Sequence, residues 1–288
     1  MTNSYYTLIT GASEGLGKSF ALECAARNHK LVLVALPGRE LHHLSEYLHK
    51  NFNTEVVVIE QDLSLDNSAV IIFNKIRSLG IEINMLINNA GIGNTKFFED
   101  ESTQFFEKQI RINVLATTTL THLFVPMLKN NSPAHILNVG SLACFFTIPK
   151  KQVYGGTKSF IYFFSKSLRE ELAAHNVNVT VLCPGGINTN AAQTMLNKSG
   201  SWISTRSLMN PEEVAPLALD GLFRKKEVII PGRLNKLFVF MDRIIPVILK
   251  RSIIKAQIGR LNAYKPPAMV KRIPVSIVNP GRPQVGPV

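Results

Sequence analysis

Short apolar runs, rich in β-branched residues, alternate along the chain with longer stretches of helical character. The runs cover residues 5–10, 30–36, 54–60, 83–91, 134–141 and 178–185. The stretches between them cover residues 17–28, 39–50, 66–79, 101–130 and 152–175. Regular alternation predicts βαβ units, and continuous apolar runs are typical of parallel strands buried on both faces. The pattern therefore predicts an α/β fold with a doubly wound parallel sheet and helices on both faces. A short run at 227–232 could add an edge strand.

The segments that directly follow the runs are the places to look for a ligand site. In a doubly wound sheet, ligands bind beyond the carboxyl ends of the strands. These segments are rich in small and polar residues, and read GASEGLG, LPGR, QDLS, NNAG, GSLA and PGGINT.

Three glycines follow the first run, at Gly11, Gly15 and Gly17. Glycine permits a tight turn and a close approach of the backbone to a phosphate, and free amides at a helix start favour an anion. The spacing G-x-x-x-G-x-G differs from the common G-x-G-x-x-G. By itself it is equally compatible with a nucleotide site and with an ordinary strand–helix turn.

Further motifs follow in order: Asn88-Asn89-Ala90-Gly91, Ser141, Tyr154-Gly-Gly-Thr-Lys158 and Pro184-Gly185-Gly-Ile187-Asn-Thr189. With all of them present, residues 5–232 resemble the classical short-chain dehydrogenase/reductase family, whose fold is of the Rossmann type. The resemblance implies a pyrophosphate turn made by Gly11, Gly15 and Gly17 and lined by Ser13 and Leu16. It also implies adenine contacts at Asp62 and Leu63, and ribose contacts at Asn89, Ala90 and Gly91. The nicotinamide loop would contain Pro184, Gly185, Ile187 and Thr189.

Tyr154 and Lys158 lie four residues apart in a helical stretch and so share a face. A nearby ammonium would lower the tyrosine pKa and suit the phenol to proton transfer. Ser141 could orient the substrate oxygen. The resemblance implies that Ser141, Tyr154 and Lys158 are catalytic, and that Tyr154 and Lys158 also contact the cofactor. It further implies that Asn113 anchors a water that relays protons to Lys158. The alternatives are a surface Tyr/Lys pair, a strand-end serine and a helix-surface asparagine.

Two features depart from the pattern of the family. Cys144 stands three residues after the serine, where a glycine is frequent, and the helix of the tyrosine contains Gly155 and Gly156 near its start. The first departure affects the shape of the pocket, and the second weakens the helix.

The end of the second run bears on the choice of cofactor. An acid there selects NAD, whereas a nearby arginine accommodates the 2′-phosphate of NADP. Leu36 occupies the position of the acid, and Pro37, Gly38 and Arg39 follow. We expect NADP(H), with Arg39 as the phosphate contact, and NAD(H) stays open.

The charged residues are distributed unevenly, with a strong excess of basic residues near the C-terminus. Residues 221–288 hold 14 of the 32 Lys and Arg residues but only 2 of the 20 Asp and Glu residues, so the whole net charge of +12 lies there. We therefore divide the chain into a dehydrogenase domain (1–232), a basic amphipathic extension (233–264) and a proline-rich tail (265–288). The extension could contact a membrane surface, form a subunit interface or cover the active site. No nucleic-acid motif and no metal-ligand spacing is seen.

The sequence thus predicts an oxidoreductase that reduces a hydrophobic ketone or aldehyde, with acyl and steroid-like compounds as candidates, and with Tyr154 as the acid. Met195, Leu196, Trp202 and Ile203 would form an apolar lid. The alternatives are an NAD-dependent alcohol dehydrogenase and a non-catalytic cofactor-binding or membrane-surface scaffold. By resemblance we expect a homodimer or homotetramer formed through 101–130 and 152–175. Three separated cysteines and no recognisable secretion signal favour a cytoplasmic protein that could associate with membranes.

Overall fold

The computed structural model describes residues 4–188, 207–246, 248–252 and 254–256. Within them, the strands form one parallel sheet in the order β3-β2-β1-β4-β5-β6-β7. Their bounds are β1 Tyr6–Thr10, β2 Lys30–Ala35, β3 Val56–Glu60, β4 Ile83–Asn88, β5 Ala134–Val139, β6 Val177–Leu182 and β7 Val228–Ile229. The order reverses between β1 and β4, which confirms the doubly wound sheet, and β7 is the expected edge strand. The lid residues and the tail 265–288 lie outside the described residues.

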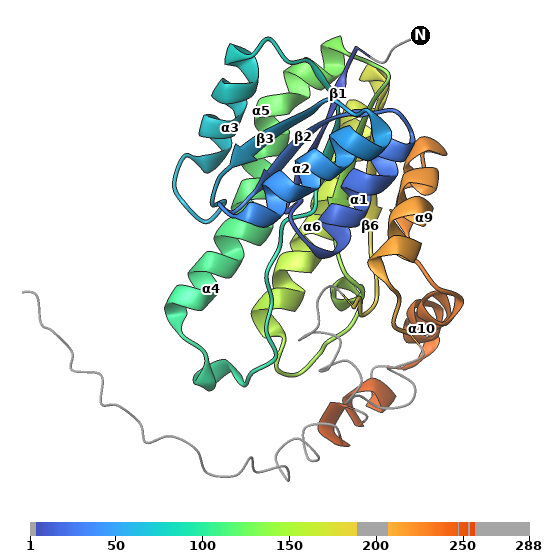
Figure 1. Cartoon of the computed structure of the whole chain (residues 1–288). Coiled ribbons are helices and arrows are strands. Elements are labelled where there is room, and N and C mark those ends of the chain that lie inside the picture. Colours follow the sequence, from blue (N-terminus) through green and yellow to red (C-terminus); the bar gives the residue numbers. More distant parts are fainter. Residues whose placement is uncertain (1–3, 189–206, 247, 253, 257–288) are drawn as a thin grey trace, which may run out of the picture.

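Two layers of helices cover the sheet (Figure 1). One layer contains α1 (Gly15–Ala26), α2 (Arg39–Phe52) and α9 (Pro211–Phe223), and the other contains α3 (Ser68–Ser78), α5 (Thr117–Asn130) and α6 (Gln152–Leu172). Successive residues of a strand pack alternately against the two helix layers. Leu8 packs in the core under α3 and α5, while Ile9 packs in the core under α1, α2 and α9. Because successive strand residues point to opposite faces, each apolar run supplies two separate cores.

The stretch predicted as one helix over 101–130 is subdivided, which corrects that prediction. It contains α4 (Thr103–Ile110), a π-helical segment (Arg111–Ala116) and then α5. Asn113 lies in the π-helical segment and is 1% exposed, so the alternative of a helix-surface asparagine is wrong. π-Helical turns commonly mark positions where a helix departs from regular geometry for a functional contact.

Helix α9 was absent from the predicted elements, although its start carries a clear signal. Pro211 is its first residue, and the backbone N–H of Asn210 donates to the Glu213 carboxylate at 3.0 Å. Proline at the first position and a glutamate three residues after the cap are typical of helix starts.

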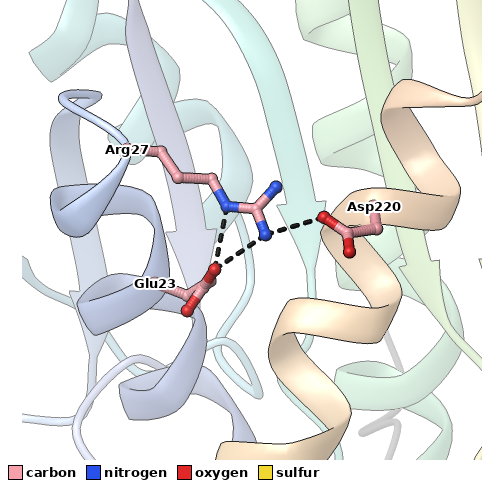
Figure 2. A network of polar contacts seen from close by, with 3 residues as sticks. All are labelled: Glu23, Arg27 and Asp220. Atoms are coloured by element: carbon pink, nitrogen blue, oxygen red, sulfur yellow. Dashed lines mark hydrogen bonds and ion pairs between the residues drawn. The ribbon is translucent and has the colours of Figure 1, made fainter.

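A polar network joins α9 to α1 (Figure 2). Arg27, the C-cap residue of α1, donates to Glu23 through Nε at 2.8 Å and to Asp220 of α9 through Nη2 at 2.8 Å. The Asp220 side chain is 51% exposed, so this ion pair contributes about 1 kcal/mol or less. The apolar core under α9 supplies most of its attachment, and the network fixes how α9 lies against α1.

Candidate active site

The turn after β1 leaves the start of α1 open. Gly11 and Gly15 have φ of +64° and +52°, which favours glycine. A Cβ on Gly17 would overlap the carbonyl oxygen of Gly11. Glu14 precedes α1 without a side-chain cap, and no acid occupies the first helical turn. The amides at the start of α1 therefore have no side-chain competitor among the described residues, and the turn fits the pyrophosphate of a dinucleotide. Ser13 lies half-buried in this turn, and Leu16 is buried behind it.

Asn89 ties the glycine turn to the loop after β4. Its side-chain amide donates to the carbonyl oxygens of Thr10 (2.9 Å) and Gly11 (3.2 Å). In return, the Thr10 hydroxyl accepts the backbone N–H groups of Asn89 (3.0 Å) and Ala90 (3.1 Å). The structure thus brings together two predicted cofactor segments, and Gly91 follows directly.

Asp62 lies just beyond β3, and the buried Leu63 follows it. The Asp62 carboxylate accepts hydrogen bonds from the Ser64 amide (2.8 Å) and hydroxyl (2.7 Å). Burial raises the pKa of Asp62, but the Ser64 bonds outweigh it and hold that pKa below its usual value. The carboxylate is therefore charged at neutral pH and held in a fixed orientation.

Arg39 is the first residue of α2 and is exposed beside the end of β2. The turn before it is held by Glu60, whose carboxylate accepts the Gly38 amide at 3.0 Å and contacts His42 Nε2 at 3.2 Å. The hydrogen bond from Gly38 lowers the pKa of Glu60. Glu60 was not among the predicted site residues, and the site combines a fixed acid with an exposed arginine here.

Ser141 follows β5 at the carboxyl edge of the sheet, and there it meets Tyr154 and Lys158 of α6. Lys158 Nζ lies 5.9 Å from the centre of the Tyr154 ring and donates to the Val139 carbonyl oxygen at 2.8 Å. Burial lowers the pKa of Lys158 to about 8. Burial raises the pKa of Tyr154, and a hydrogen bond with Ser141 opposes this only in part. The expected net lowering of the tyrosine pKa is therefore not seen in this arrangement, because burial dominates.

Asn113 clamps the loop after β4 to α6. Its side-chain oxygen accepts the Ile92 amide at 2.9 Å, and its Nδ2 donates to the Ile92 carbonyl (2.9 Å) and the Thr157 hydroxyl (3.1 Å). A Cβ on Gly91 would lie 3.2 Å from Lys158 Nζ and 3.3 Å from Asn113 Oδ1. Asn113 thus lies next to the lysine, with its side-chain amide bonded to the Ile92 backbone and the Thr157 hydroxyl.

The loop after β6 contains Pro184, Gly185 and Ile187, and the predicted Thr189 lies outside the described residues. Asn235 of α10 (Arg233–Ile244) packs under this loop, since a Cβ on Gly185 would lie 2.8 Å from its Nδ2. Asn235 is 1% exposed and donates to the Pro231 carbonyl oxygen at 2.8 Å. Sequence reasoning missed it, because one asparagine in an amphipathic helix carries no local signal of burial.

Cys144, the departure noted in the sequence, faces a second thiol. Its Sγ lies 3.8 Å from Sγ of Cys183, at the end of β6. Contact with Cys144 and burial together raise the pKa of Cys183 well above its usual value. The space that a glycine would leave near Ser141 is thus filled by a pair of thiols.

A hollow of about 680 Å³ begins beside the tyrosine, on the same turn of α6. Its surface is largely apolar, with Phe97, Phe146, Ile148 and Pro149 among the lining residues, and Glu99, Lys150 and Lys151 line it as well. Lys151 Nζ lies 5.5 Å from the centre of the Tyr154 ring, which connects the hollow to the site. Within the described ranges there is no cluster of three or more His, Cys, Asp or Glu side chains that could hold a metal.

Comparison with known proteins agrees with this geometry. A family model described as short chain dehydrogenase matches residues 6–200. The very-long-chain 3-oxoacyl-CoA reductase of Rattus norvegicus is 33% identical over 194 residues, which cover 65% of this chain and 61% of that protein. The chain thus spans about three fifths of the length of the curated relatives it matches.

Two solved structures extend the comparison to nearly the whole chain. The bulky-bulky ketone specific alcohol dehydrogenase from Comamonas testosteroni is 26% identical, with a TM-score of 0.71, covering 93% of this chain and 98% of that one. A short-chain dehydrogenase from Sphingobium yanoikuyae, solved in complex with NADPH, is 26% identical, with a TM-score of 0.72, covering 94% and 100%.

Proposed function

Because the chain belongs to the short-chain dehydrogenase family, we propose that it is an oxidoreductase that uses NADPH to reduce the carbonyl group of a hydrophobic ketone or aldehyde. The observation that carries the proposal is the convergence of Ser141, Tyr154 and Lys158 beside the loop after β4, which Asn89 ties to the glycine turn before α1. A proton donor, an oxygen-orienting hydroxyl and a buried cation are thus connected, through this loop, to a turn that fits a dinucleotide.

Each of these side chains has a distinct task in the proposed reaction. Bound NADPH would supply the hydride to the carbonyl carbon. The Tyr154 hydroxyl donates a proton to the carbonyl oxygen, and the Ser141 hydroxyl orients that oxygen and stabilises its developing charge. Burial keeps the Tyr154 phenol protonated, which suits reduction. Lys158 holds a positive charge below the tyrosine, and Asn113 fixes the loop against which Lys158 packs.

The hollow beside Tyr154 supports a substrate with a substantial apolar part. Its aromatic and aliphatic lining would bury an acyl chain or a fused ring system, while Lys150 and Lys151 would favour an anionic group at the edge. The 3-oxoacyl-CoA reductase and the ketone-specific dehydrogenase among the similar proteins support the same class. A panel of long-chain 3-oxoacyl thioesters, bulky ketones and aldehydes, assayed by NADPH consumption, tests the proposal. Turnover of none of them, with NADPH still bound, would favour the scaffold alternative.

We expect Arg39→Ala to weaken NADPH binding roughly 10- to 100-fold, through loss of a charge-assisted contact to the 2′-phosphate. NADH binding should not change, because NADH lacks that phosphate. Titration followed by nicotinamide fluorescence measures both affinities. Arg77→Ala, which removes an exposed arginine from the last turn of α3, is the matched control. Preference of the wild-type protein for NADH would contradict the assignment of Arg39 and favour the alternative of NAD-dependent alcohol oxidation.

A homodimer or homotetramer is part of the proposal. Ile110, Leu115, Phe160 and Phe163 lie on α4, the π-helical segment and α6, and are 42–66% exposed. Covering such side chains is favourable, so these helices are the expected subunit interface. We expect sedimentation to give a dimer or larger for the wild-type chain and a smaller species for Phe163→Glu. A wild-type chain that sediments as a monomer would contradict the expectation.

A further inference from the structure

Helix α10 carries apolar residues on two opposite faces. Val239 and Asn235 are buried against the rest of the protein, at 5% and 1% exposure. On the opposite face lie Leu234, Leu237, Met241 and Ile244, spaced by three, four and three residues so that they align along the helix. They are 39%, 48%, 44% and 62% exposed, and Phe240 beside them is 61% exposed. We call these five residues the outer stripe.

The described residues after α10 add further exposed apolar side chains. Ile248 and Leu249 are 78% and 56% exposed, among the most exposed large apolar side chains of the described part. So many exposed large apolar side chains in one segment are unusual unless a partner covers them. Within the residues that the structure describes, no helix is both long and apolar enough to span a bilayer. The exposed apolar side chains of α10 and of residues 248 and 249 therefore indicate a contact surface.

Basic residues greatly outnumber acids along α10 and the described residues after it. Arg233, Lys236, Arg243, Arg251 and Lys255 are all exposed. Asp242 is the one acid among residues 233–256, and it pairs with Lys250 at 2.8 Å. Lys236 and Arg243 also line a hollow between α10, β7 and α6, where Lys166 is paired with Glu227 at 3.2 Å. The occupant of this surface must therefore be apolar at its centre and negative at its edge.

A second copy of this chain does not meet that description. In a two-fold interface the same patch faces itself, so the basic rim would meet a basic rim, and like charges oppose the contact. An anionic lipid surface provides both parts, because acyl chains lie beneath a layer of negative headgroups.

We propose that α10 and the described residues 248–252 and 254–256 dock the protein on an anionic lipid bilayer, with the outer stripe in the acyl boundary and the basic side chains on the headgroups. The helix lies beyond the carboxyl ends of the strands, beside α9 (Figure 1). Ile254 lines the hollow beside Tyr154, and Asn235 packs against the loop after β6. Docking would thus bring an apolar opening next to the active site toward the membrane, from which an apolar substrate could enter.

The test is sedimentation of the full chain with two kinds of vesicle, phosphatidylcholine alone and equimolar phosphatidylcholine and phosphatidylglycerol. We expect binding to the anionic vesicles that weakens with added salt, and little binding to the neutral ones. Phe240→Ser/Ile244→Ser should weaken binding about tenfold or more, because it removes two of the outer-stripe side chains. Both positions are exposed, so the fold should persist, and unchanged NADPH affinity of the variant verifies this.

The matched control is Ile71→Ser/Leu79→Ser, which replaces two exposed apolar residues at α3 and its C-terminal cap. It should bind vesicles as the wild-type protein does. Failure of the wild type to bind, equal binding to neutral vesicles, or unchanged binding of the outer-stripe variant would each overturn the proposal. A change of oligomeric state in that variant without a change in vesicle binding would point to a protein interface instead. These outcomes do not depend on turnover, so they are independent of the proposed reaction.

Discussion

Tyr154→Phe should lower kcat for carbonyl reduction by roughly 10²–10⁴-fold, the range expected when a general acid is lost. The substitution removes only the phenol oxygen, which is the proposed proton donor. NADPH affinity should change little, because the glycine turn and the loop after β4 are held by hydrogen bonds that do not include this oxygen. Steady-state kinetics with the best substrate of the carbonyl panel, together with NADPH titration, measures both quantities.

Tyr162→Phe is the matched control for this prediction. Tyr162 lies two turns further along α6 and packs its ring against Phe145, with ring centres 5.0 Å apart. Its hydroxyl has no task in the proposed reaction, so kcat should stay near the wild-type value. Equal kcat for Tyr154→Phe and wild type would show that another group supplies the proton. A parallel loss in both variants would mean that kcat reports packing of α6, not proton transfer.

Gly17→Ala should lower the free energy of unfolding by about 1–3 kcal/mol and abolish NADPH binding at ordinary concentrations. The added Cβ would overlap the Gly11 carbonyl oxygen and lie 2.6 Å from Asn89 Nδ2. To make room, the turn must move away from the start of α1 and from the loop after β4. Those are the segments that position the dinucleotide in the proposed function. Urea denaturation and nicotinamide fluorescence measure the two effects.

Gly156→Ala is the control substitution, for which we expect neither destabilisation nor loss of NADPH binding. A Cβ at this position meets no atom within 4 Å, and the residue lies inside α6. Alanine should therefore stabilise the helix by up to about 1 kcal/mol and leave NADPH binding unchanged. If Gly17→Ala and Gly156→Ala proved equally harmless, the close packing of the turn would have no bearing on stability or on cofactor binding.

The departures from sequence expectation occur where distant segments meet. The four-residue spacing of Tyr154 and Lys158 indicated a shared face but not the depth of burial, which reverses the expected direction of the tyrosine pKa. The run containing Asn113 indicated a helix, but not the π-helical segment or the clamp on Ile92 and Thr157. Asn235 and Glu60 contribute to the site only through loops that lie far away in sequence.

The amino-acid sequence by itself determined the parallel sheet and the strand ends that carry the motifs. It could do so because strand and helix periodicities and glycine turns are local patterns of side-chain size and polarity. Only the tertiary structure decided which polar groups are buried, which backbone groups they hold, and which face of α10 is left uncovered. Burial and hydrogen-bond partners depend on segments brought together by the sheet order, and no local pattern specifies that neighbourhood.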